Sequence, residues 1–319
     1  MNNILFTLNT VLPVFIIIFI GYLLKRAKFI NENFISISSN LVFKIALPSL
    51  VFIKVSNADI KELAVYNEII FAIISVTVIF FLSMIFSFIF IKNRAQTGVF
   101  AHGISRGNYG IVALSLLFNM MGDAGMAKGA IVLAVVSPLY NIYGTIALII
   151  PQQKLSWNGL KTILIKIITN PIIISLLLSF IVLLIKWFYP LFSMPKFINT
   201  TINNFSALSM PVALIGIGGS LSLSHIKNNK LLVLLATLLR LVFLPSLFTI
   251  IAIFLGFKNE GLAALYMLFA VPTAVASFVF AKSMNGDSDL AANIIVTTTA
   301  GSVITISIGI FILKVFGLV

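Results

Sequence analysis

Three basic side chains, Lys44, Arg106 and Arg240, fall inside long apolar segments of the chain, whereas no Asp or Glu lies deep in any of them. A charge inside an apolar segment is costly, so it usually marks a ligand path or a specific partner. An arginine guanidinium matches a carboxylate in bidentate geometry, which favours anion capture by Arg106. Lys44 is a second candidate for the anion, although for Lys44 and Arg240 snorkelling or capping of backbone carbonyls explains the charge at least as well.

A run of helix-weakening residues follows Arg106, and a proline lies at the matched depth of a second segment. Gly107, Asn108 and Gly110 lower helix propensity, and Pro272 removes a backbone donor. Two helices broken at the same depth are expected to cross there and to line a polar cavity with their freed backbone groups. The N-termini of half-helices favour a negative ligand. An ordinary proline kink filled by a Ser or Thr is the alternative.

Other polar residues in apolar segments are candidates for orienting a substrate or holding a coupling ion. A buried Asn must find partners, which makes Asn141 a candidate for the substrate site. A proton could use His102, and a sodium ion could use side-chain oxygens such as those of Asn293 and Thr297. Transport of the anion without a coupling ion, driven by the membrane potential, is a third alternative. No cofactor is expected, and the absence of cysteine excludes a Cys-based metal site.

The elements that must position these residues are membrane helices. Hydrophobic residues make up 60% of the chain and charged residues 9%, which leaves too little polar surface for a water-soluble globule. No Asp or Glu occurs between Asp123 and Glu260. A window of about 20 residues, the length that crosses a bilayer core, gives ten segments. They are 4–24, 34–54, 69–91, 97–120, 128–150, 167–188, 203–223, 231–255, 261–282 and 290–314.

Similar proline- and glycine-containing pairs of residues recur in the two halves of the chain at a nearly constant separation. Leu47-Pro48 corresponds to Met210-Pro211, and Gly122-Asp123 corresponds to Gly286-Asp287. A shared register predicts a repeat, with residues 1–155 as the first half and 156–319 as the second. Because five crossings is an odd number, the second half must enter the membrane from the opposite side, as in the inverted repeats of many secondary transporters. Independent apolar helices would share no register.

The distribution of Lys and Arg among the loops predicts the orientation. Eleven lie in the loops on the side that follows the first helix, and seven lie on the other side together with five of the eight acids. Because basic loops stay cytoplasmic, both termini are expected outside, with the chain in the inner membrane. The net charge of +13 does not indicate nucleic-acid binding, because the basic residues are scattered between apolar runs and form no continuous face.

Six stretches, taken in their order along the chain, carry a family resemblance. They are Leu12-Pro13 with Gly21-Tyr22-Leu23-Leu24, Leu41-Val42-Phe43 through Leu47-Pro48, Arg106-Gly107-Asn108-Tyr109-Gly110, Met210-Pro211 through Gly218-Gly219-Ser220-Leu221, Val271-Pro272-Thr273-Ala274, and Asp287 through Thr297-Thr298-Thr299. In this order the chain resembles the auxin efflux carrier family, whose bacterial members include malate and malonate permeases. The resemblance departs at Asn108, where plant members have a proline.

The resemblance implies an all-α protein of ten helices with broken, crossing helices four and nine. A scaffold domain would comprise helices 1, 2, 6 and 7, and an elevator-like transport domain would comprise helices 3–5 and 8–10. The family's substrate carboxylate sits at the crossing, which here implies binding by Asn108, Tyr109, Pro272 and Thr273. Malate, malonate or an auxin-like indole carboxylate would be the substrate, and a homodimer the assembly.

Two other classes of function compete with a carrier of small organic anions. A passive anion channel would need a lined pore and not a site closed by opposed broken helices. A polytopic membrane enzyme would need a catalytic constellation. Ser105 and His102 are close in sequence but lack a nucleophile motif and a distant base, and no paired-Asp metal motif occurs. The sequence therefore favours a carrier that is not an enzyme.

Overall fold

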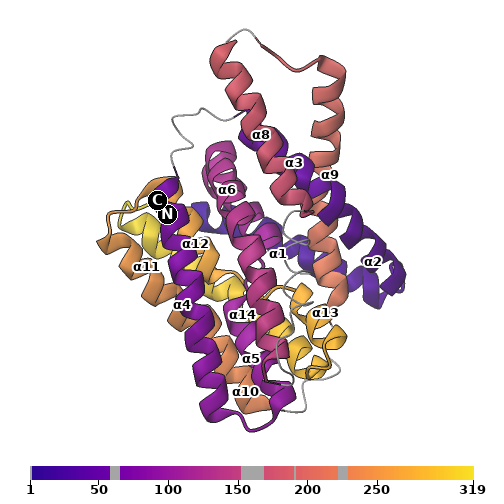
Figure 1. Ribbon diagram of the computed structural model, residues 1–319, viewed down its shortest axis with the longest axis vertical. Helices are drawn as coiled ribbons and strands as arrows, with labels where there is room; N and C mark the ends of the chain where they lie inside the picture. The colour runs from indigo at the N-terminus through magenta and orange to yellow at the C-terminus, as the bar shows by residue number, and fades with distance from the viewer. Residues whose placement is uncertain (1, 58–64, 152–168, 190–191, 222–228) are drawn as a thin grey trace.

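The computed structural model describes residues 2–57, 65–151, 169–189, 192–221 and 229–319, and this part of the chain is helical (Figure 1). Its one β-type pairing is an isolated antiparallel bridge between Gly107 and Thr273. Within the described ranges, eight helical stretches are long and apolar enough to cross a membrane: Asn3–Arg26, Glu32–Ser56, Tyr66–Phe90, Tyr109–Ile149, Pro171–Phe188, Lys196–Ser220, Lys230–Phe254 and Ser288–Val315. The prediction of an all-helical multi-pass membrane protein is confirmed.

Large apolar side chains cover the outside of these helices. In α4 (Tyr66–Phe90), Ile74, Phe81, Leu82 and Ile85 are each more than half exposed. A helix that is apolar on every face is either buried in a large core or surrounded by lipid. Because α4 lies at the outside of the bundle, its exposed face is expected to contact lipid.

Two of the long helices contain one π-helical turn directly before a proline. The second span consists of α2 (Glu32–Leu41), η1 (Val42–Ala46) and α3 (Leu47–Ser56), and the span 230–254 consists of α10 (Lys230–Leu238), η3 (Leu239–Phe243) and α11 (Leu244–Phe254). In both, the sequence Leu-Pro-Ser-Leu follows the π-helical turn, at Pro48 and at Pro245. Proline has no N–H and clashes with the preceding turn, and the wider turn accommodates it without breaking the helix.

The segments predicted as 97–120 and 261–282 are both interrupted. The first consists of α5 (Arg94–Ser105), an extended stretch at 106–108, and then η2 (Tyr109–Ala113) leading into α6 (Leu114–Ile149). Gly122, with φ of 63°, ends this second half and separates it from the rest of α6. The other consists of α12 (Asn259–Ala270), a non-helical stretch at 271–275, and α13 (Ala276–Ser283). Because α5, α12 and α13 are too short to span a bilayer alone, the described ranges contain eight full-length spans, and the ten predicted crossings stay a prediction.

A compact group of helices faces these interrupted segments. It contains α1 (Asn2–Arg26), α2, α3, α8 (Pro171–Phe188) and α9 (Lys196–Ser220), which pack on one another. Glycines bring α1 and α9 into backbone contact: a Cβ added at Gly218 would overlap the carbonyl oxygen of Ile18, and one at Gly21 would overlap that of Ile215. The remaining helices pack around the interrupted segments and α14 (Ser288–Val315).

Both ends of the chain lie next to each other (Figure 1). The ammonium of Lys314, near the end of α14, lies 4.6 Å from the ring centroid of Phe6 in α1. The two termini are therefore on the same side of the bundle. The predicted boundary between the two halves of the chain, at residues 155 and 156, lies outside the described residues, as do five of the loop lysines that predict the orientation: Lys61, Lys154, Lys161, Lys166 and Lys227.

Candidate functional site

The two interrupted segments meet, and backbone hydrogen bonds join them. The N–H of Asn108 donates to the carbonyl of Pro272 at 2.8 Å, and the N–H of Ala274 donates to the carbonyl of Arg106 at 3.1 Å. We call residues 106–108 and 271–275 the crossing. These bonds satisfy backbone groups that the broken helices leave free. Lipid offers no hydrogen-bond partners for such groups.

Thr273 fixes the crossing from within. Its hydroxyl donates to the carbonyl of Gly103 in α5 at 2.7 Å, and its N–H donates to the hydroxyl of Thr298 in α14 at 3.2 Å. Thr273 is 1% exposed. The side chain therefore ties both half-helices and α14 together.

Arg240, in η3, lies behind the crossing and is also 1% exposed. Its guanidinium donates to the carbonyls of Ile104 at 3.3 Å, Leu268 at 3.2 Å and Val271 at 2.9 Å. These carbonyls belong to the last turns of α5 and α12, where the helix dipoles are negative. Of the two explanations for this charge given by the sequence, capping of backbone carbonyls is the one found.

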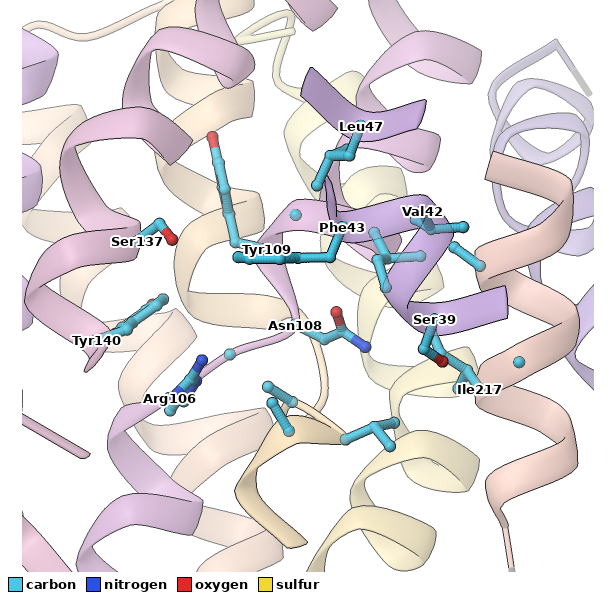
Figure 2. Close-up of a pocket in the computed structure, with 18 of the residues that line it drawn as sticks. Ser39, Val42, Phe43, Leu47, Arg106, Asn108, Tyr109, Ser137, Tyr140 and Ile217 are labelled. Carbon is cyan, nitrogen blue, oxygen red and sulfur yellow. The ribbon is translucent and has the colours of Figure 1, made fainter. Parts of the chain in front are cut away.

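A cavity of about 310 Å³ lies between the crossing and the facing group of helices. This volume is at the small end of the range for small-molecule sites. On one side it is lined from the crossing, η2, α6 and α13, and on the other from α2, η1, α3, α8 and α9. Figure 2 shows Arg106 and Tyr140 on one side, Ser39 and Ile217 on the other, and Asn108 between them. Apart from Arg106, the described lining residues are uncharged.

The guanidinium of Arg106 is held in place but only partly satisfied. Nη2 donates to Oδ1 of Asn141 at 3.1 Å, and the guanidinium carbon lies 4.7 Å from the ring centroid of Phe280. Nη1 is buried and has no hydrogen-bond partner within the described structure. A buried charged donor without an acceptor is expensive, so the arrangement favours an anionic ligand in the cavity.

Two helix N-termini border the same cavity. The helix that begins at η2 has Asn108 as its N-cap, and α13 has Val275, and both residues line the cavity. The first N–H groups of a helix have no acceptor within it, and the helix dipole adds a partial positive charge there. Both termini therefore reinforce the positive field of Arg106.

Six of the seven predicted substrate residues lie in or next to the cavity lining or the crossing. Arg106, Asn108 and Tyr109 line the cavity, and Asn141 holds Arg106 without lining it. Pro272 and Thr273 form the crossing, but neither lines the cavity, because their polar groups bond the facing half-helix.

Lys44, the remaining residue predicted for the substrate site, lies outside the cavity lining. Its side chain is exposed on η1 and does not line the cavity, which fits the snorkelling explanation. The neighbours Val42 and Phe43 line it in place of Lys44.

Two residues of α6 that line the cavity, Ser137 and Tyr140, were not predicted from the sequence. Tyr140 is 6% exposed, and its hydroxyl lies beside the Arg240 guanidinium and the Gly107 N–H. The nearest signal in the sequence is Asn141, the neighbour of Tyr140. Ser39, across the cavity in α2, has no signal of its own.

The candidates for a coupling ion lie outside the cavity lining. His102, one turn before Arg106 in α5, is 1% exposed, and its Nε2 has no hydrogen-bond partner within the described structure. Asn293 is buried in α14, and the hydroxyl of Thr297 shares a 2.8 Å hydrogen bond with that of Thr237 in α10. All three therefore lie in α5 or α14, away from the surface that lines the cavity.

Interrupted helices that meet beside a cavity in a multi-pass membrane protein are the architecture of secondary transporters. A family model described as membrane transport protein matches residues 6–310. The chain belongs to this family, which is that of the auxin efflux carriers.

Curated relatives match the chain over nearly its whole length. An uncharacterized transporter of Methanocaldococcus jannaschii is 24% identical over 311 residues, which are 94% of this chain and 97% of the relative. The uncharacterized transporter YfdV of Escherichia coli K12 is 22% identical over 316 residues, 96% of this chain and 98% of the relative. Another, from Methanothermobacter thermautotrophicus, is 20% identical over 303 residues, 93% of this chain and 95% of the relative. All three are named as transporters and none as an enzyme.

Proposed function

We propose that this protein is a secondary transporter that moves a small organic anion, a carboxylate such as malate, malonate or an indole carboxylate, across the inner membrane. The observation that carries the proposal is the buried, unpartnered Nη1 of Arg106 beside a cavity with no carboxylate among its described lining residues. A substrate carboxylate would accept from Nη1 and from the N–H groups of the two helix N-termini. Asn108, Tyr109, Ser137 and Tyr140 would orient the rest of the molecule.

We propose ten membrane crossings. Each interrupted segment, counted with both of its halves, is long enough for one crossing. Two such segments added to the eight full-length spans of the described ranges give ten. An even number is supported by the position of Lys314 beside Phe6, which places both termini on one side. Two interrupted segments that pair as antiparallel strands at one bridge also support two inverted repeats of five helices, at 1–155 and 156–319.

The mechanism we propose is elevator-type alternating access. The scaffold would be helices 1, 2, 6 and 7, which correspond to α1, α2 to α3, α8 and α9, and the transport domain would be helices 3–5 and 8–10. Two features support it: the cavity lies between these groups, and Arg106 with both helix N-termini is carried by the second group. Movement of that group would carry the bound anion past a stationary apolar wall.

Orientation, assembly and coupling belong to the same proposal. Both termini would lie outside, as the loop charges predict, and two copies would pair through their scaffold helices. The coupling ion would be a proton at His102 or sodium near Asn293 and Thr297, or transport would follow the membrane potential.

The test is uptake of labelled malate, malonate and indole-3-acetate into proteoliposomes, with and without gradients of pH and sodium. A carrier gives saturable uptake that unlabelled substrate on the other side accelerates by counterflow, whereas a passive channel gives no counterflow. Arg106→Gln is expected to lower uptake strongly at anion concentrations below the KM of the parent, for whichever anion the parent carries. Unchanged uptake by this variant, in protein that folds normally, would reject the site.

A further inference from the structure

Arg240 is the largest fully buried side chain of the described protein, and it is cationic. Its guanidinium donates hydrogen bonds to the carbonyls of Ile104, Leu268 and Val271, which come from both half-helices that end at the crossing. None of the ion pairs in the described structure includes it. One guanidinium therefore joins two chain segments that are far apart in sequence and that otherwise meet through few hydrogen bonds.

The contacts of Arg240 enclose the backbone of Arg106. Ile104, two residues before Arg106, accepts from Nη1 of Arg240, and Gly107, directly after Arg106, packs on Nη2 so closely that an added Cβ would overlap it. Arg240 also lies beside the hydroxyl of Tyr140, a residue of the cavity lining. Arg240 thus contacts the chain on both sides of Arg106.

We infer that Arg240 is a positioning residue for anion binding: its guanidinium fixes the ends of α5 and α12 against each other and so places Arg106 at the cavity. This inference rests on the proposed function. The shape of the guanidinium is essential to it, because a lysine ammonium carries the same charge but has no planar fork to span three carbonyls in two helices. Arg240→Lys therefore separates positioning from charge.

Because the chain has no cysteine, one introduced thiol can report on the cavity without knowledge of the substrate. Ser137→Cys places the thiol in the cavity lining. Its rates of reaction with an anionic methanethiosulfonate, which carries a sulfonate, and with the trimethylammonium analogue measure the charge selectivity of the cavity. The parent is expected to favour the anionic reagent, and Arg106→Gln to remove the preference. A preference that survives Arg106→Gln would refute the proposed anion site, independently of Arg240.

In the same background, Arg240→Lys is expected to lower the ratio of anionic to cationic rates by up to about 25-fold. Displacing one unit charge from about 4 Å in water changes each rate by about fivefold, and the two reagents respond in opposite directions. Gly107→Ala is a second variant, because its Cβ displaces the guanidinium while leaving Arg240 in the chain. Gly103→Ala in α5 is the control, since the three atoms nearest to its Cβ all belong to the Ile294 side chain, at 3.2 Å or more, and the ratio is expected to stay at the parent value.

Thermal melting and size-exclusion elution decide which variants are folded. A parental ratio in folded Arg240→Lys and Gly107→Ala would overturn the inference, because charge alone would then suffice. Unfolding of both variants would overturn it as well, since Arg240 would then be needed for the fold and not for positioning. A reduced ratio in either folded variant, with Gly103→Ala unchanged, would support it.

Discussion

The backbone N–H of Asn108 donates a 2.8 Å hydrogen bond to the carbonyl of Pro272, a residue in the other half of the sequence. Proline supplies no N–H of its own at this point, and its carbonyl is free because the helix ends before it. The bond therefore joins two breaks that the sequence encodes separately, by glycines around Asn108 and by Pro272 itself. The anion site of the proposed transporter depends on this pairing.

Arg106→Gln is expected to raise the KM for the transported anion by about tenfold to a hundredfold, because a charge-assisted hydrogen bond contributes about 1.5–3 kcal/mol. Concentration-dependent uptake into proteoliposomes measures the effect. The matched control is Arg94→Gln at the start of α5, the helix that ends before Arg106, because Arg94 stacks on Phe88 much as Arg106 stacks on Phe280 but does not line the cavity. Equal KM values for the two variants would contradict the role of Arg106.

Asn141→Asp is expected to impair anion uptake more than Asn141→Ala. The amide oxygen of Asn141 accepts from Nη2 of Arg106, so a carboxylate there would neutralise the guanidinium and compete with the substrate. The alanine removes one acceptor and leaves the positive charge. The KM values of the two variants, measured side by side, check this order. A smaller effect of the aspartate would show that the charge of Arg106 is not what binds the anion.

Gly218→Ala is expected to destabilise the protein, whereas Gly216→Ala in the same helix is expected to leave the melting temperature near the parent value. A Cβ at Gly218 overlaps the Ile18 carbonyl of α1, and backbone cannot move aside as a side chain can. A Cβ at Gly216 meets only the Ser39 hydroxyl, at 3.6 Å. Overpacking costs about 1–3 kcal/mol. The melting temperatures of the two variants are measured in detergent by intrinsic fluorescence. Equal melting temperatures would contradict close packing of α1 on α9.

A short bismaleimide between Lys54→Cys and Asp123→Cys is expected to stop transport. Lys54, at the end of α3, forms a 2.5 Å ion pair with Asp123 beside the Gly122 kink, so the bridge joins the proposed scaffold and transport domains. Elevator motion requires these groups to separate. Uptake is measured before and after cross-linking.

The control for the cross-link is the pair Gln96→Cys and Asp287→Cys. Gln96 and Asp287 share a 2.9 Å hydrogen bond between α5 and the start of α14, both within the proposed transport domain. A bridge there is expected to leave uptake intact. Full uptake with residues 54 and 123 bridged would exclude relative motion of the two groups.

The sequence alone determined the features that depend on local chemistry. The apolar spans follow from composition, and the interruptions follow from Gly107, Gly110 and Pro272, because helix propensity and the missing proline N–H act within one turn. Arg106 was predicted as an anion site because a cation in an apolar segment needs a partner. Ten crossings and the inverted repeat remain predictions.

Only the tertiary structure decided how the cations are used. Arg240 and Lys44 look alike in sequence, yet one is buried on three carbonyls and the other is exposed. Pro272 and Thr273 hold the crossing, and Tyr140 and Ser39 line the cavity from opposite sides. These roles depend on which helices become neighbours, because a hydrogen bond requires two groups within about 3 Å, whatever their separation along the chain.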